Sequence, residues 1–124
     1  MIDTRDIADV AVAELLRRDK APATLPRLTL DLVGPQALTG ADAAKAWRDS
    51  LGREVIYGGS EFGAFEAQLA LFGPGCLAHD MRLMMARIQE IGMHGVSGAV
   101  DRLQTILGRP LRSYSDFVKD AVAR

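Results

Sequence analysis

Methionine side chains gather near the end of one predicted helix, where their chemistry could form a surface for a ligand. Met81, Met84 and Met85 lie in that helix, and Met93 follows it. Methionine is flexible and polarizable, so this cluster suits an adaptable surface for an apolar ligand. Packing of the same side chains in an ordinary core is the interpretation that we favour from the residues alone.

Metal chemistry depends on the two histidines and the single cysteine. His79 and His94 stand fifteen residues apart, so one helix face does not present both to a metal ion. One cysteine forms no internal disulfide and, with two histidines, predicts no zinc site. His94 lies in the GMHG segment, where glycines favour an exposed position suited to substrate contact. We expect no metal site, and we expect His79 to be a surface or hydrogen-bonded histidine.

The first acidic residues, Asp3 and Asp6, have two interpretations. As a pair they are candidates for acid/base catalysis, but Asp3 also fits as the N-cap of a helix over residues 4–18. Asp6 then lies in the first turn, where the helix dipole favours negative charge, and we favour this interpretation. The helical spacing of apolar residues predicts the following buried stripe: Ile7, Ala8, Ala11, Val12 and Leu15.

Composition excludes several classes of protein. The 124 residues carry 15 Lys and Arg against 16 Asp and Glu, a net charge of −1, so no basic field indicates nucleic acid or a membrane surface. No stretch approaches the roughly 20 apolar residues of a membrane span, and the N-terminus lacks the pattern of a secretion signal. We expect one cytoplasmic domain over residues 1–124.

Capping residues predict about six helices, and alternation predicts two strands. Thr39 with Asp42, and Ser113 with Asp116, have the spacing of capping boxes at helix starts. The longest helix is expected near residues 77–91.

Alternating leucines predict a strand at residues 28–33, and residues 55–57 predict a second strand. A right-handed crossover through a helix at 41–51 would make these two strands parallel. The predicted fold class is therefore mostly α with a minimal parallel two-stranded sheet, an α/β remnant.

Four stretches in this order carry a family resemblance: IDTRDIADVAVAELL, LDLVGPQALTGADAAKAW, LGREVIYGGSEFGAF and VDRLQTILGRPLRSYSDFVKDA. Together they resemble the C-terminal portion of NmrA-like proteins, which are atypical short-chain dehydrogenase/reductase relatives. The resemblance implies the substrate-binding portion of an NAD(P)-dependent oxidoreductase or epimerase-like protein, without the N-terminal Rossmann domain. A non-catalytic module that binds a small ligand or a protein, derived from that family, is the alternative.

The resemblance also implies where a substrate would lie. In the family, the segment around Phe62 and the long helix that follows it face the substrate cleft. The implied substrate-binding residues are Phe62, Met81, Met84, Met85 and His94.

No catalytic or cofactor-binding residue is carried over. The segments GGSEFG and GPGCLA lack the G-x-G-x-x-G spacing of a dinucleotide loop. Tyr114 and Lys119 stand five apart, one residue too many for the family's Tyr-x-x-x-Lys pair. NAD(P) is therefore expected only with a separate nucleotide-binding domain.

The chain begins where the family crosses from its nucleotide domain into the substrate-covering part, so a short natural protein and a fragment both remain open. In the family, the first helix and the strand edge lie against the nucleotide domain. We expect a homodimer through the same surfaces, or a separate Rossmann-domain partner. The apolar residues concerned are Ile2, Ile7, Leu15, Leu28, Leu30 and Leu32.

The missing loop leads to a direct test. Because backbone N–H groups of a glycine-rich loop normally hold the pyrophosphate, this chain alone should not bind NAD(H) or NADP(H) tightly. We expect calorimetric titration to give no dissociation constant in the low micromolar range, with a dinucleotide-binding dehydrogenase as positive control. A low-micromolar constant for this chain would contradict the interpretation.

Overall fold

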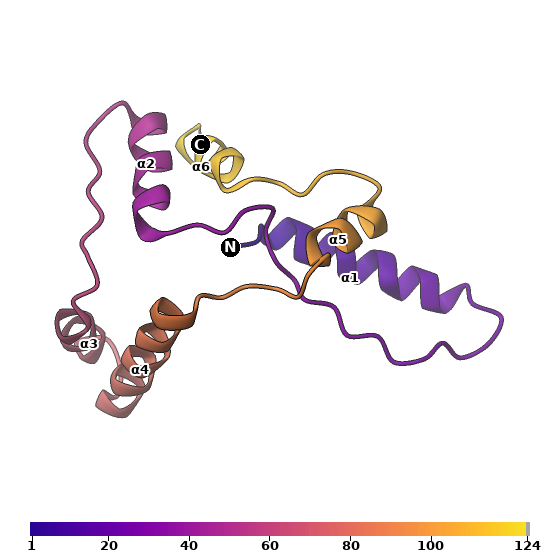
Figure 1. Ribbon diagram of the computed structural model, residues 1–124, viewed down its shortest axis with the longest axis horizontal. Coiled ribbons are helices and arrows are strands. Elements are labelled where there is room, and N and C mark those ends of the chain that lie inside the picture. Colours follow the sequence, from indigo (N-terminus) through magenta and orange to yellow (C-terminus); the bar gives the residue numbers. More distant parts are fainter. Residues whose placement is uncertain (124) are drawn as a thin grey trace. The chain divides into compact units, whose positions relative to one another are not determined.

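Six helices make up the regular secondary structure of residues 1–123, the part of the chain that the computed structural model describes (Figure 1). In chain order they are α1 (Thr4–Asp19), α2 (Gly40–Leu51), α3 (Phe62–Ala70), α4 (Gly75–Ile91), α5 (Ala99–Leu107) and α6 (Tyr114–Val122). The expected number of helices is thus confirmed. None of the six is long and apolar enough to cross a membrane.

The helices belong to two units. The first consists of Met1–Ile56 with the described residues from His94 onward, and in it α1 packs on α5 while α2 packs on α6. The second is Tyr57–Met93, a hairpin in which α3 packs on α4. Figure 1 shows each of these helix pairs.

The predicted parallel sheet is wrong, because residues 1–123 contain no strand. Residues 28–33 and 55–57 are extended, yet no backbone–backbone hydrogen bond joins them to any other described residue. A strand needs a neighbour for its N–H and C=O groups, and an isolated two-stranded pair is only marginally stable. Ile56 is 76% exposed, so the second segment also lacks a packed apolar face. Alternation therefore predicted two strands that the described residues do not contain.

Three predicted helix caps are confirmed, at the starts of α1, α2 and α6. The Asp3 side chain accepts a hydrogen bond from the Arg5 backbone N–H at 2.8 Å. Thr39 forms a capping box with Asp42 at the start of α2, and Ser113 forms one with Asp116 at the start of α6. These interactions lie within a few residues along the chain, so they follow from the local sequence.

The buried face of α1 differs from the predicted stripe. Asp6 and Val10 are its buried residues, whereas Leu15 is 66% exposed and Val12 is also exposed. Val10 packs in the main core cluster with Leu103 of α5 and Leu111. The helix is thus turned so that the predicted stripe lies to one side of the core.

A buried cluster of ion pairs explains this orientation of α1. Asp6 is fully buried, and its Oδ1 accepts hydrogen bonds from Arg109 Nη2 at 2.8 Å and from Arg112 Nη1. Its Oδ2 accepts from the Arg112 backbone N–H at 2.7 Å. Asp9, half exposed, accepts from the same two guanidinium groups, and hydrogen bonding from Arg112 and then Arg109 lowers the pKa of Asp9. The cluster joins α1 to the loop between α5 and α6.

The cluster predicts a large loss of stability on removing the Asp6 charge. Asp6→Asn leaves two arginines facing a neutral amide in a desolvated site, and we expect it to lower the free energy of unfolding by about 3 kcal/mol. The half-exposed Asp9→Asn is the matched control and should lose less than about 1 kcal/mol. Urea unfolding at pH 7 measures both values. Equal losses would show that the buried charge of Asp6 contributes no more to stability than the half-exposed charge of Asp9.

Candidate functional site

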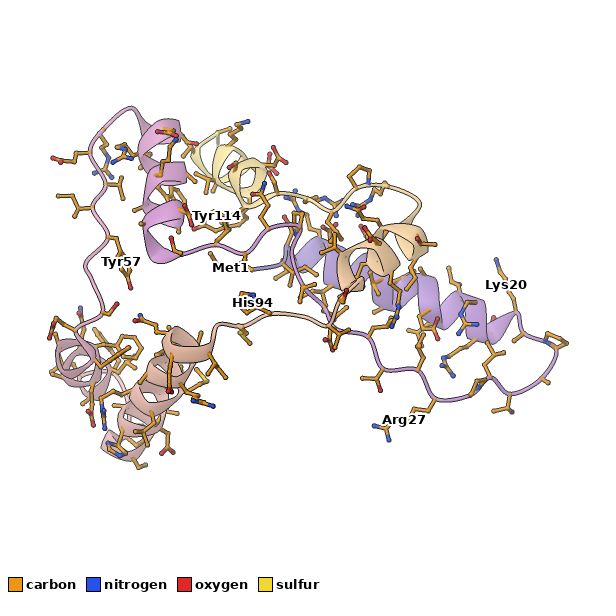
Figure 2. All side chains as sticks on the ribbon, viewed as in Figure 1. Met1, Lys20, Arg27, Tyr57, His94 and Tyr114 are labelled. Carbon is orange, nitrogen blue, oxygen red and sulfur yellow. The ribbon has the colours of Figure 1, made fainter. Side chains whose placement is uncertain are left out.

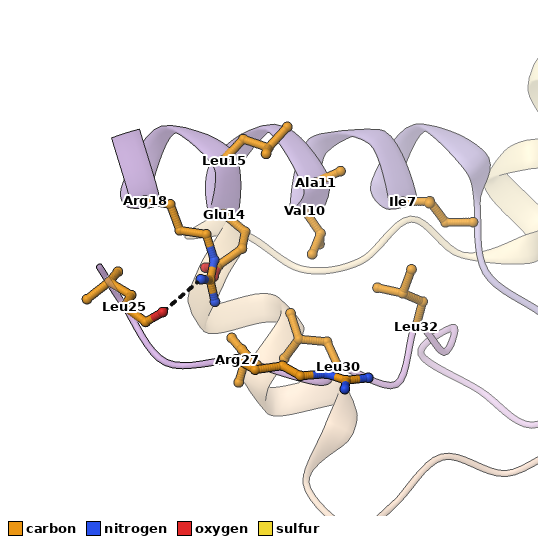
Figure 3. A pocket seen from close by; sticks show the side chains of 11 residues that line it. Ile7, Val10, Ala11, Glu14, Leu15, Arg18, Leu25, Arg27, Leu30 and Leu32 are labelled. Atoms are coloured by element: carbon orange, nitrogen blue, oxygen red, sulfur yellow. Dashed lines mark hydrogen bonds and ion pairs between the residues drawn. The ribbon is translucent and has the colours of Figure 1, made fainter. Parts of the chain in front are cut away.

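An open apolar groove lies within the first unit, between α1 and the extended residues that follow it (Figure 3). Its volume is about 700 Å³. It is lined by Ile7, Val10, Ala11, Glu14, Leu15, Arg18, Leu25, Arg27, Leu28, Leu30 and Leu32.

The two sequence patterns noted above produce the two walls of the groove. Ile7, Ala11 and Leu15 recur at helical spacing and form a stripe on α1. Leu28 and Leu30 belong to the alternating set, and side chains two apart on an extended chain point to the same side. Three of the five residues of the predicted apolar stripe of α1 therefore line this open groove and are not buried in the core.

The near end of the extended segment is held by Glu14 and Arg18. Arg18 Nη1 donates to the Leu25 carbonyl at 3.3 Å, and Nη2 donates to the Pro26 carbonyl at 2.9 Å (Figure 3 draws the first bond). Glu14 Oε1 accepts from Arg18 Nε at 2.7 Å, which orients the guanidinium toward these carbonyls. Hydrogen bonding from Arg17 and then Arg18 lowers the pKa of Glu14 to about 2.

The far end of the segment is held by Asp31 and Gly34. Asp31 Oδ2 accepts a hydrogen bond from the Val96 backbone N–H at 2.9 Å. Gly34 is buried, and a Cβ there would lie 1.6 Å from the carbonyl oxygen of Met1, so only glycine fits this close approach. The extended segment is fixed at both ends while its middle keeps free backbone groups.

The groove can bind but offers little for catalysis. Of its charged side chains, Glu14 and Arg18 are paired with each other, and Arg27 makes no ion pair with another described residue. Its other walls are mostly leucine, isoleucine and alanine. No cluster of three His, Cys, Asp or Glu suited to a metal occurs among residues 1–123. A dinucleotide site also does not fit, because the pyrophosphate normally lies between a strand and the following helix and this part of the chain has no strand.

Four of the five predicted substrate-binding residues lie in the second unit. Phe62 opens α3, and Met81, Met84 and Met85 belong to α4. Met84 is 45% exposed, and the other three are half-buried. The hairpin thus keeps one methionine on its surface while the others pack partly within it.

The fifth predicted residue, His94, is exposed and belongs to the first unit (Figure 2). The second unit therefore contains Phe62 and the three methionines, whereas His94 belongs to the first unit. The substrate-binding role of all five remains a prediction.

The other histidine takes part in a charged network on the hairpin. His79 Nδ1 lies 3.0 Å from Glu66 Oε1, and Arg82 Nε lies 2.7 Å from Glu66 Oε2. This confirms the prediction that His79 is a surface, hydrogen-bonded histidine. The interaction joins α3 to α4 and holds the two helices of the hairpin in register.

Sequence reasoning missed the charged residues of the groove. Glu14 and Arg18 stand four apart on a helix, a spacing that predicts an ion pair. Nothing local indicates that Arg18 also reaches two carbonyls of the segment beyond α1. Arg27 was missed as well, because its leucine neighbours indicate an apolar surface and no local pattern marks the arginine as part of a groove.

One comparison with known proteins finds a relative. The chain is 34% identical over 119 residues to an NAD(P)H azoreductase of Xenophilus azovorans. The match includes 95% of this chain but 39% of the azoreductase, so the chain spans about two fifths of that protein's length. No family model and no solved structure matches the chain. The chain is therefore similar to part of an NAD(P)-dependent reductase.

The low pKa of Glu14 predicts a pH dependence. The folded-state pKa of about 2 lies below the ordinary value of 4.5, so the ionised form is favoured in the folded state. Its stabilising effect is complete above about pH 5 and is lost as the pH falls toward 2. We expect Glu14→Gln to reduce the fall of the thermal midpoint between pH 5 and pH 2, followed by circular dichroism.

Glu90→Gln is the matched control for this experiment. Glu90 also pairs with an arginine on a helix, Arg87, but both side chains are largely exposed. Its replacement should leave the pH dependence of the wild type nearly unchanged. If the two variants behave alike, the interactions of Glu14 do not stabilise the fold.

Proposed function

We propose that this chain is the substrate-binding portion of an NmrA-like, NAD(P)-dependent oxidoreductase. The observation that carries the proposal is the 34% identity to an NAD(P)H azoreductase over 95% of this chain. The hydride chemistry requires a nicotinamide held by a nucleotide-binding domain, which this chain does not supply. Its own part is to bind and orient the substrate.

The α3–α4 hairpin is the substrate-binding element of this proposal. Its surface offers Met84 together with the exposed Leu77 and Ile91, which stand at intervals of seven on α4. Residues at this spacing lie along one side of a helix and form an apolar stripe. A flat aromatic substrate such as an azo compound or a quinone would bury its rings against such a stripe.

Methionine also explains how one surface accommodates related substrates. Its side chain is unbranched and adapts its shape, and its sulfur contacts aromatic rings favourably. Phe62, Met81 and Met85 support Met84 from within the hairpin, and His94 is proposed as a polar contact to the substrate.

The proposal predicts that the chain alone binds an aromatic azo compound. We expect 4-hydroxyazobenzene to bind saturably in equilibrium dialysis, and Met84→Ala to weaken binding about fivefold, since one partly buried side chain contributes about 1 kcal/mol. Leu83→Ala is the matched control, because Leu83 is exposed to a similar degree on the same helix but lies outside the stripe and outside the predicted set. Absence of saturable binding, or equal effects of the two substitutions, would contradict the proposed substrate surface.

A non-catalytic module that binds a small ligand or a protein is the second candidate. The open groove of the first unit favours it, because an apolar groove without reactive groups suits binding alone. Combining the chain with the nucleotide-binding part of the Xenophilus azovorans azoreductase separates the two candidates. NAD(P)H-dependent azo reduction by the mixture, absent from either part alone, supports the first candidate. A mixture that binds the azo compound without reducing it supports the second.

A further inference from the structure

The middle of the segment between α1 and α2 has no backbone hydrogen-bond partner. Residues 22–38 make no backbone–backbone hydrogen bond within the part of the chain that the structure describes. Arg27, Leu28 and Thr29 are exposed, and both ends of the segment are fixed by side-chain interactions. An exposed segment with free backbone N–H and C=O groups, held at both ends, can pair with another strand.

We infer that two copies of this chain pair through residues 27–31, antiparallel, across a two-fold axis at Thr29. In this register Arg27 of one copy lies opposite Asp31 of the other, and Leu28 lies opposite Leu30. The two threonines face each other on the axis. The pairing ends at Pro26, which has no backbone N–H to donate.

The sequence of the segment is self-complementary in this register on both faces of the new sheet. The leucines fall on the face that lines the groove against α1, so cross-strand leucine pairs extend the apolar surface between the two copies. Arg27 and Asp31 alternate with the leucines along the segment, and the two-fold axis brings them together as two Arg–Asp pairs. In the single chain Arg27 is exposed at the border of the groove. A self-complementary patch of this kind is what a two-fold dimer requires.

The charged groups are available for these pairs. No ion pair within residues 1–123 involves Arg27, and Figure 2 shows its side chain projecting from the extended segment. Asp31 uses Oδ2 for the Val96 backbone N–H, which orients the carboxylate, and Oδ1 makes no hydrogen bond to any other described residue. Shifting the register by one residue would place Arg27 opposite Leu30 and remove both ion pairs.

The first test measures mass and backbone protection on the full chain. We expect sedimentation equilibrium at micromolar concentration to give twice the chain mass of 13.4 kDa. Hydrogen exchange should show protected amides within residues 27–31 in the dimer and fast exchange of the same amides on dilution to monomer. A monomer that persists on concentrating would overturn the inference, and so would a dimer in which these amides exchange fast.

The second test uses charge reversal. In the Arg27→Asp variant, the aspartate at position 27 of each copy lies opposite Asp31 of the other copy. Two carboxylates therefore face each other at each end of the paired segment. We expect the dimer dissociation constant to rise about tenfold, since each cross-strand pair is worth up to roughly 1 kcal/mol. Arg53→Asp is the matched control, because Arg53 is an exposed arginine outside the segment. It should leave the dissociation constant unchanged.

The decisive experiment mixes two variants with opposite charge changes. Asp31→Arg alone places two arginines opposite each other, so its homodimer should also be weak. Mixing the Arg27→Asp chain with the Asp31→Arg chain restores two opposite-charge pairs, and native mass spectrometry distinguishes the heterodimer by its mass. A heterodimer as tight as the wild-type dimer supports the register, whereas a mixture no tighter than the homodimers overturns it. If the Asp31→Arg chain fails to fold, the Arg27→Asp comparison and the hydrogen exchange decide the question.

Discussion

The buried carboxylate of Asp6 determines how the first unit is arranged. A fully desolvated carboxylate is tolerated only where charged or hydrogen-bonding partners surround it, and Arg109, Arg112 and the Arg112 backbone N–H are the partners here. Because these partners belong to the loop between α5 and α6, the carboxylate fixes the rotation of α1 as well as its position. Val10, one turn further along, then packs against Leu103 and Leu111.

The groove follows from this rotation. With Asp6 and Val10 turned toward α5, the apolar residues Ile7, Ala11 and Leu15 face the extended segment instead of the core. Glu14 and Arg18 fall on the same side and hold the segment by its carbonyl groups. Hence one buried charge leads to an open apolar groove beside a segment that is held at both ends and has free backbone groups. These are the features on which binding by the first unit depends.

The two units supply different surfaces for function. The first has the groove and the strand edge, both suited to a polypeptide partner, and the second has a hairpin with an apolar, methionine-containing stripe suited to a small aromatic molecule. Among the described residues, neither has a glycine-rich phosphate loop between a strand and a helix. This division agrees with the proposal that the chain binds substrate while a nucleotide-binding domain supplies the reducing equivalents.

The sequence by itself determined what depends on near neighbours. Asp3, Thr39 with Asp42, and Ser113 act within three residues along the chain, so the starts of α1, α2 and α6 and the number of helices were predictable. Only the tertiary structure decided that Asp6 is buried, because its arginine partners are 103 and 106 residues away. The absence of a sheet among the described residues was decided in the same way, since a strand forms only where a second strand lies beside it. Periodicity indicates that a helix has an apolar stripe, but the contacts of the folded chain decide whether the stripe lies in the core or lines a groove.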